Sequence, residues 1–154
     1  RGLQTISFDL DPACVEKNYL QAIKKKEKNI LPLLFDLANP SPKIGWKNEE
    51  SLSLIERGPV DTALALALIH HLVISNNLQL SKIAAFFDKI CRSLIIEFIP
   101  KSDPMIQSMI SFRKDIFENY TKDAFEKEFS RFFVILKAER IKESERTLYL
   151  ISKK

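Results

Sequence analysis

Glycine is scarce in this 154-residue chain, and this limits what the chain can bind by itself. The three glycines are Gly2, Gly45 and Gly58, and none of them lies in a Gly-x-Gly pattern. Glycine-rich turns let backbone N–H groups approach a phosphate closely. The chain therefore contains no phosphate-cradling loop, which argues against a nucleotide-dependent enzyme that is complete within these residues.

Cysteine is scarce as well, since only Cys14 and Cys91 are present. They lie far apart, and neither belongs to a Cys-x-x-Cys or Cys–His pattern of the kind that binds zinc. We expect no metal site and predict that both thiols stay reduced, in the core or on helices of a cytoplasmic protein.

Long apolar runs and a strong net charge are also missing. No run reaches the roughly 18–20 apolar residues of a membrane-crossing helix, and residues 1–4 lead into a strand-like segment rather than a signal peptide. The net charge of +4 is mild, and the basic run Lys24 to Lys26 has no interleaved aromatic residues. We therefore predict a cytoplasmic protein that binds no membrane and shows no strong signal for nucleic acid.

The segment that organises the chain is residues 60–72. It is an apolar run that is opened by Asp61 and ends in the adjacent pair His70 and His71. Its periodicity fits a strand buried on both faces and a buried helix equally well.

Apolar runs elsewhere in the chain favour the strand. Shorter runs at residues 5–9, 30–36 and 93–100 are separated by helix-like segments, which is typical of an α/β protein with a mostly parallel sheet. Residues 60–72 are therefore predicted to form a strand that leads into a turn or short helix. Two alternating runs at residues 132–141 and 146–152 predict a C-terminal antiparallel hairpin.

Helices are predicted at residues 12–28, 78–92, 103–117 and 122–129. Asp11 and Thr121 have the residue types and positions of N-caps for the first and the last of these helices. Pro32 cannot donate a ladder hydrogen bond, so its strand is predicted to lie at a sheet edge. The long segment 37–59 is expected to be a functional loop.

The ends of the predicted strands carry a resemblance to a known class of enzymes. The relevant segments are residues 6–12, 34–37, 60–72 and 94–98. They resemble the second to fifth strands of a class I S-adenosylmethionine-dependent methyltransferase, a Rossmann-like α/β fold whose mostly parallel sheet ends in an antiparallel hairpin.

Three blocks narrow this resemblance. They are residues 36–42 with Gly45-Trp46, residues 65–72 and residues 96–104. Together they are similar to a bacterial methyltransferase-like family, some members of which are described as nodulation proteins.

The resemblance implies that S-adenosylmethionine is the cofactor. It implies that Asp9 binds the ribose hydroxyls and that Asp36 accepts a hydrogen bond from the adenine amino group. The backbone N–H of Leu37 would reach a ring nitrogen, and Leu10 and Ala67 complete the implied cofactor contacts. From the residues alone, Asp9 is also a candidate helix cap and Asp36 a candidate turn residue.

His70 and His71 would face the substrate, just past the fourth strand of the fold. Imidazole titrates near neutral pH and can take a proton from a methyl acceptor, so both are candidate catalytic residues. The alternative is that one ring packs inward and the other is partly exposed.

Glu97 is an acid inside an apolar strand, which is costly unless it is paired or lies at a cleft. Lys101, Arg113 and Arg146 are possible partners, although Arg146 is expected to be structural. Trp46 is expected either to line a pocket or to lie in a small core beneath the long loop.

The first strand of the resembled fold, with its glycine-rich turn, is absent from these residues. Residues 1–154 are therefore predicted to be a single, N-terminally incomplete domain whose partner is the N-terminal remainder of the same protein. That protein is expected to transfer a methyl group from S-adenosylmethionine to an unknown acceptor, while this part alone is inactive. The alternatives are a non-catalytic α/β interaction module and a different nucleotide-dependent enzyme.

Overall fold

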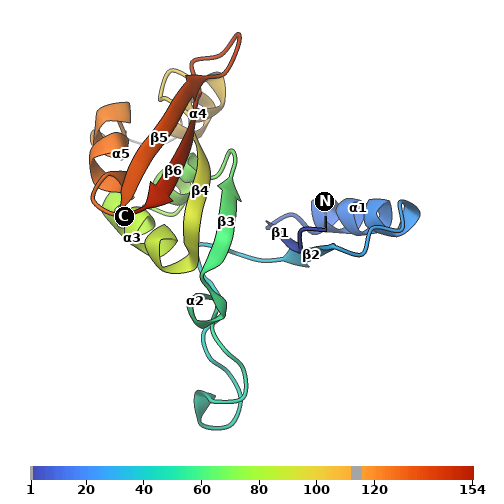
Figure 1. The fold of residues 1–154 in the computed structure, drawn as a ribbon. Coiled ribbons are helices and arrows are strands. Elements are labelled where there is room, and N and C mark those ends of the chain that lie inside the picture. Colours follow the sequence, from blue (N-terminus) through green and yellow to red (C-terminus); the bar gives the residue numbers. More distant parts are fainter. Residues whose placement is uncertain (1, 112–115) are drawn as a thin grey trace. The chain divides into compact units, whose positions relative to one another are not determined.

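The computed structural model describes residues 2–111 and 116–154. The chain divides into two compact units, Arg1–Pro42 and Lys43–Lys154, each of which contains a parallel pair of strands (Figure 1). The α/β class predicted from the alternation of apolar runs is confirmed, although in the described part of the chain two strand pairings are parallel and two are antiparallel.

The first unit is a β-α-β arrangement of β1 (Thr5–Asp9), α1 (Pro12–Lys24) and β2 (Ile30–Leu34). The two strands are parallel, and their register places Ser7 beside Pro32. Pro32 has no N–H to donate, and β2 pairs with β1 alone in the described part of the chain. The prediction of an edge strand is therefore confirmed.

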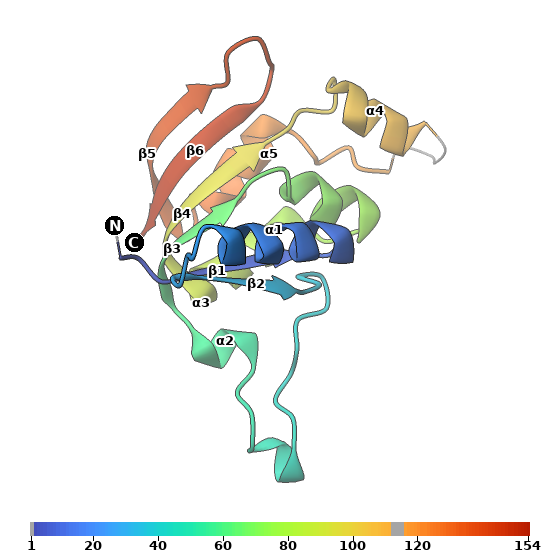
Figure 2. The same ribbon diagram turned by 90° about the vertical axis from the view of Figure 1, so that its right-hand side faces the viewer.

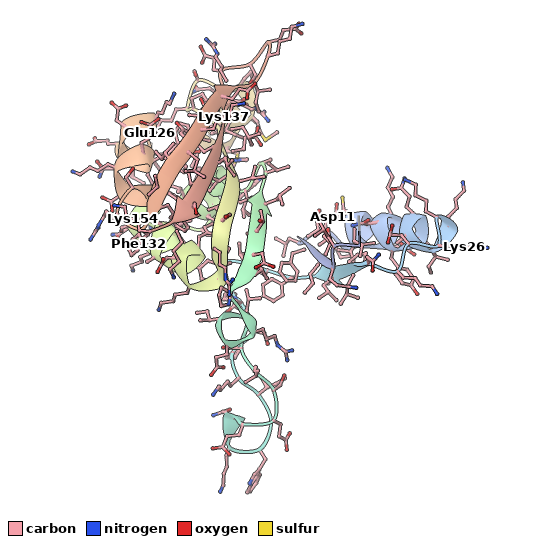
Figure 3. The ribbon with its side chains drawn as sticks, viewed as in Figure 1. Asp11, Lys26, Glu126, Phe132, Lys137 and Lys154 are labelled. Carbon is pink, nitrogen blue, oxygen red and sulfur yellow. The ribbon has the colours of Figure 1, made fainter. Side chains whose placement is uncertain are left out.

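The start of α1 follows the sequence signal. Asp11 is the N-cap, and its Oδ1 accepts a hydrogen bond from the N–H of Ala13 at 2.8 Å. Pro12 occupies the first turn, where its missing N–H costs nothing. Asp11 and Lys26 lie at opposite ends of this helical segment (Figure 3).

The end of α1 comes earlier than predicted, at Lys24 instead of Lys28. Lys26 has a φ of 54°, in the left-handed region, so the chain turns there. The turn brings the carbonyl of Asn29 to the N–H of Thr5 at 2.7 Å, which starts the pairing of the two strands.

The face that α1 turns to the strands differs in part from the prediction. Asn18 donates a hydrogen bond to Ser7 at 3.2 Å, so the polar Asn18 lies over the sheet. Helical spacing in the sequence predicts that Val15, Tyr19, Leu20 and Ile23 face the strands. Val15 is half-buried, whereas Tyr19, Leu20 and Ile23 are more than half exposed. No described residue of this unit is buried.

The second unit holds a four-stranded sheet in the order β3-β4-β6-β5. The strands β3 and β4 are parallel, and the other two pairings are antiparallel, which confirms the C-terminal hairpin. Its strands are β3 (Val60–Ala65), β4 (Cys91–Phe98), β5 (Phe133–Arg140) and β6 (Thr147–Lys153). Its helices are α2 (Leu54–Arg57), α3 (Leu80–Ile90), α4 (Pro104–Ile110) and α5 (Lys122–Phe129), with short turns η1 (Trp46–Asn48) and η2 (His71–Ser75).

The core of the second unit lies between this sheet and the helices α3 and α5, which cover one face (Figure 2). Phe125 on α5 packs at 5.3 Å from Phe98 and at 4.9 Å from Tyr149, measured between ring centroids. All three side chains are almost fully buried. Burying each such ring contributes roughly 1.5–3 kcal/mol.

The other face of the sheet carries apolar side chains that remain exposed in the described part of the chain. Leu64, Ile95 and Leu150 lie in register across β3, β4 and β6, and Ile95, between the other two, is half-buried. Leu64 is 66% exposed and Leu150 is 38% exposed. The strand β3 is one edge of the sheet.

The remaining predictions differ mainly at element ends. Residues 60–72 form a strand that leads into a short helical turn, as expected. The helix predicted at 103–117 ends at Ile110; residues 112–115 lie outside the described residues, and 116–117 are not helical. Among the described residues, no helix has the length and apolar character needed to cross a membrane.

Candidate functional site

Two carboxylates follow the carboxyl ends of the parallel strands of the first unit. Asp9 ends β1 beside Leu34 of β2, and Asp36 comes two residues after Leu34. The N–H of Phe35 donates to the carbonyl of Asp9 at 2.9 Å, which extends the pairing beyond the end of β2. Asp9 and Asp36 therefore lie at the same edge of this sheet, where open α/β sheets bind ligands.

Both carboxylates also close a local turn. Oδ1 of Asp9 accepts from the N–H of Asp11 at 2.9 Å, and Oδ1 of Asp36 accepts from the N–H of Ala38 at 2.8 Å. Asp9 thus does not cap α1, because Asp11 does. Among the described residues, the second oxygen of each carboxylate accepts no hydrogen bond, and both side chains are exposed.

The residues beside these carboxylates form a small aromatic surface. Phe8 and Phe35 stack with their ring centroids 4.6 Å apart. Leu10 is 67% exposed, and Leu37 is half-buried. The ligand roles that the sequence predicts for Leu10 and Leu37 stay predictions.

In the second unit, the turn after β3 is joined to β4 by a buried carboxylate. Glu97 is 7% exposed, and its Oε2 accepts a hydrogen bond from the N–H of Ala67 at 2.7 Å. Ala67 has a φ of 49°, in the left-handed region that a residue with a Cβ seldom adopts. The carboxylate therefore binds the strained residue of this turn.

Arg146 joins Glu97 to Asp103. Its Nε donates to Asp103 at 2.7 Å, and its Nη1 lies 3.5 Å from Oε1 of Glu97. The hydrogen bond from Arg146 lowers the pKa of Asp103, and the same bond raises the pKa of Arg146. Asp103 also caps α4 by accepting from the N–H of Met105 at 3.0 Å.

The pairing of Glu97 with Arg146 was one of three predicted possibilities. Arg113, another of them, lies outside the described residues. The ion pair between Arg146 and Asp103 was missed, since 43 residues separate the two and no local pattern marks the contact. Trp46 is 76% exposed, so it lies in no buried core beneath the loop.

The two histidines differ sharply in environment. This agrees with the alternative drawn from the sequence, in which one ring packs inward and the other is exposed. His70 is fully buried, while His71 is exposed and its ring lies 4.1 Å from that of His70. Burial, with smaller contributions from His71 and Arg146, lowers the pKa of His70 to about 4. His70 is therefore neutral at pH 7, and within the described part of the chain neither of its ring nitrogens has a hydrogen-bond partner.

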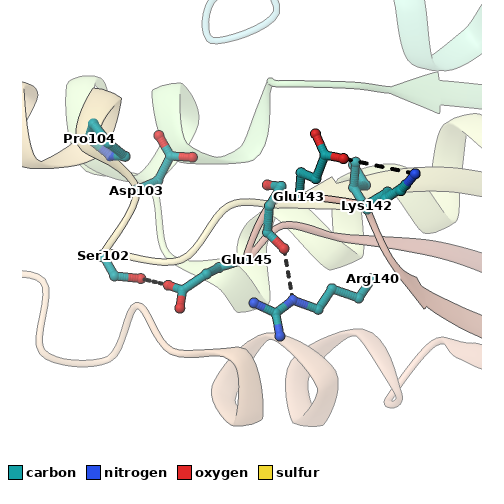
Figure 4. Close-up of a pocket in the computed structure, with 9 residues that line it drawn as sticks. Ser102, Asp103, Pro104, Arg140, Lys142, Glu143 and Glu145 are labelled. Carbon is teal, nitrogen blue, oxygen red and sulfur yellow. Dashed lines mark hydrogen bonds and ion pairs between the residues drawn. The ribbon is translucent and has the colours of Figure 1, made fainter.

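A shallow depression of about 610 Å³ adjoins Asp103 and the tip of the β5–β6 hairpin (Figure 4). The hydroxyl of Ser102 donates a hydrogen bond to the carboxylate of Glu145 there. Nζ of Lys142 lies 3.9 Å from Oε1 of Glu143, with which it forms an ion pair. Most of the residues that line it are polar or charged, with charges of both signs, so this surface offers hydrogen-bonding groups to a ligand.

Solved structures with a similar fold identify the class of architecture. The co-crystal structure of WbdD and the kinase inhibitor LY294002 matches with a TM-score of 0.63 and 13% identity, over 98% of this chain and 31% of that one. The structure of the 16S rRNA methylase ArmA matches with a TM-score of 0.53 and 18% identity, over 97% of this chain and 61% of that one. The chain therefore has a methyltransferase-like α/β fold.

A particular relative is similar in sequence. The chain is 36% identical over 146 residues, or 95% of its length, to the nodulation protein NoeA of Rhizobium meliloti (strain 1021). It spans 30% of the length of that relative. No family model matches the chain.

Proposed function

We propose that this chain is part of a methyltransferase that uses S-adenosylmethionine. The observation that carries the proposal is the placement of Asp9 and Asp36 at one carboxyl edge of a parallel strand pair. The methyltransferase-like fold and the similarity to NoeA support it.

The first unit supplies groups that fit an adenosine. The free oxygen of Asp9 is proposed to accept from the ribose hydroxyls, and that of Asp36 from the adenine amino group. The backbone N–H of Leu37 and the side chain of Leu10 are proposed to contact the base and ribose. Carboxylates at this edge bind hydroxyls in other nucleotide-binding α/β folds, which supports these roles.

For the second unit by itself, the proposal concerns the transfer step. Bound S-adenosylmethionine supplies an electrophilic methyl group on its sulfonium. The turn at Ala67 is proposed to contact the cofactor, and His70 and His71 to serve the acceptor. His71, which is exposed, would take the proton of the acceptor, and His70 would orient its ring. Most of the rate enhancement would come from holding the reactants in line.

The remainder of the longer protein is proposed to complete the site. The chain spans 30% of NoeA and has only three glycines. A glycine-rich cofactor turn and the first strand of the fold would therefore come from that remainder. The free edge of β3 and the exposed leucines on the open face of its sheet support this proposal.

A second candidate is a non-catalytic interaction module that keeps the fold. It is favoured by the exposure of Asp9 and Asp36 to solvent. In this case both carboxylates serve only the turns that they close.

Calorimetry with S-adenosylhomocysteine on the full-length protein separates the two candidates. Asp9→Asn should weaken binding by roughly tenfold or more, because it removes a charge-assisted hydrogen bond while its amide oxygen can still accept from Asp11. Glu16→Gln, on the exposed surface of α1, is the matched control and should bind like wild type. A folded wild-type protein that shows no binding would favour the non-catalytic module.

A further inference from the structure

Glu97 is a buried charge to which the proposed reaction assigns no role. It lies on β4 among apolar neighbours, and it is one of the few buried polar residues in the described part of the chain. Burying a carboxylate is costly unless charged and hydrogen-bonding partners compensate. Its partners therefore indicate what it does.

The strongest of these partners is a backbone N–H. The 2.7 Å bond from Ala67 to Oε2 of Glu97 is charge-assisted, and such bonds are about twice as strong as neutral ones. A left-handed residue with a Cβ is otherwise disfavoured by roughly 1–2 kcal/mol. The bond thus offsets the strain at Ala67. This residue lies in the turn after β3, three positions before His70.

Arg146 holds Glu97 in place for this bond. It contacts Oε1, the oxygen that does not bind Ala67, and it is anchored in turn by Asp103 at 2.7 Å. The network consequently joins the turn after β3, the strand β4, the start of α4 and the start of β6.

We propose that Glu97 is a positioning residue that holds the Ala67 turn in its cofactor-binding conformation. This inference rests on the proposed function, because it assumes that the turn contacts S-adenosylmethionine. Glu97 acts through the backbone of Ala67 and does not touch the cofactor. The competing explanation is that the network only stabilises the fold.

The test combines two measurements on the full-length protein: amide hydrogen exchange at Ala67 by NMR, and the affinity for S-adenosylhomocysteine by calorimetry. Glu97→Met removes both acceptor oxygens. It should speed exchange at Ala67 and weaken binding by at least tenfold each, since a charged acceptor is lost. Glu97→Gln keeps one acceptor oxygen, so it should retain part of the exchange protection at Ala67 and part of the affinity. It serves as the main variant if Glu97→Met fails to fold.

The matched control is Asp103→Asn. It weakens the ion pair with Arg146 but can still cap α4, because Asn is as good an N-cap as Asp. Exchange at Ala67 and affinity should both change less than in Glu97→Gln, because Arg146 and both carboxylate oxygens of Glu97 remain in place. A purely structural network would instead make Asp103→Asn as harmful as Glu97→Gln.

The outcomes separate the two hypotheses. If wild type binds and Glu97→Met binds equally well while exchange at Ala67 rises, the bond is structural and the positioning role is wrong. If exchange at Ala67 does not change, the hydrogen bond between Ala67 and Glu97 does not protect this amide, and the positioning role is wrong as well. If folded wild-type protein does not bind, the proposed function and this inference fall together.

Discussion

The imidazole of His70 is an unusual residue for a protein core. It is fully buried, and in the described part of the chain both ring nitrogens lack a hydrogen-bond partner. A buried polar group without a partner costs about 1–3 kcal/mol. Residues that break a packing rule at such a cost are expected at functional sites, which supports the role proposed for the histidine pair.

The lowered pKa of His70 predicts a loss of stability in acid. In the unfolded chain, His70 binds a proton near pH 6.5, whereas in the folded chain it binds one only near pH 4. Between these pH values the unfolded state therefore binds more protons than the folded state. The free energy of unfolding should therefore fall as pH drops from about 6.5 to about 4, by roughly 1.4 kcal/mol for each pH unit in this range. Urea unfolding followed by circular dichroism across this range measures the loss.

The variant His70→Leu isolates this contribution. Its stability at pH 7 should equal that of wild type or exceed it by up to about 1–3 kcal/mol, because an apolar side chain of similar size replaces an unpartnered polar one. The fall in the free energy of unfolding between about pH 6.5 and about pH 4 should be smaller by the contribution of His70. His71→Gln, at the exposed ring, is the control and should keep most of the acid-side loss, because burial is the main cause of the lowered pKa of His70. An unchanged acid profile in His70→Leu would contradict the prediction.

At the scale of elements, local signals placed the helix starts well. Asp11 caps α1, and Thr121 caps α5 by accepting from the N–H of Ala124 at 3.2 Å. A cap depends on residues that are close in sequence, so a single sequence suffices to find it. The face of α1 was predicted only in part: Val15 is half-buried, but Tyr19, Leu20 and Ile23 are exposed, and Asn18 lies over the sheet through its bond to Ser7.

The cap at Thr121 allows a quantitative prediction. Thr121→Ala should lower the free energy of unfolding by about 1 kcal/mol, since the hydroxyl that accepts from Ala124 is lost. Thr121→Ser keeps that hydroxyl and should stay close to wild type. Chemical denaturation of both variants measures the difference, and equal stabilities for Ala and Ser would show that the cap contributes nothing.

At the scale of the whole molecule, the two units differ in how much they bury. The first unit has no buried residue in its described part, whereas Leu94, Ile96 and Phe98 of β4 are at most 2% exposed. Regions with few buried apolar contacts open more easily. The first unit should therefore open locally at a lower free energy than the second unit.

Hydrogen–deuterium exchange on the 154-residue chain tests this difference. Amides of β1 and β2 should exchange at least tenfold faster than those of β4 and β6, since local opening of the first unit exposes little new apolar surface. Mass spectrometry of peptides from each strand gives the rates. Equal protection in the two units would contradict the prediction.

The sequence by itself determined the strands, the helix starts, the hairpin and the general α/β class. These depend on apolar periodicity and on caps, which act over a few residues. Only the tertiary structure decided that Glu97 reaches Ala67, that Arg146 reaches Asp103, and that His70 rather than His71 is buried. Such contacts join residues 30 to 43 positions apart, or depend on which side of a turn meets the core, and no local pattern encodes them.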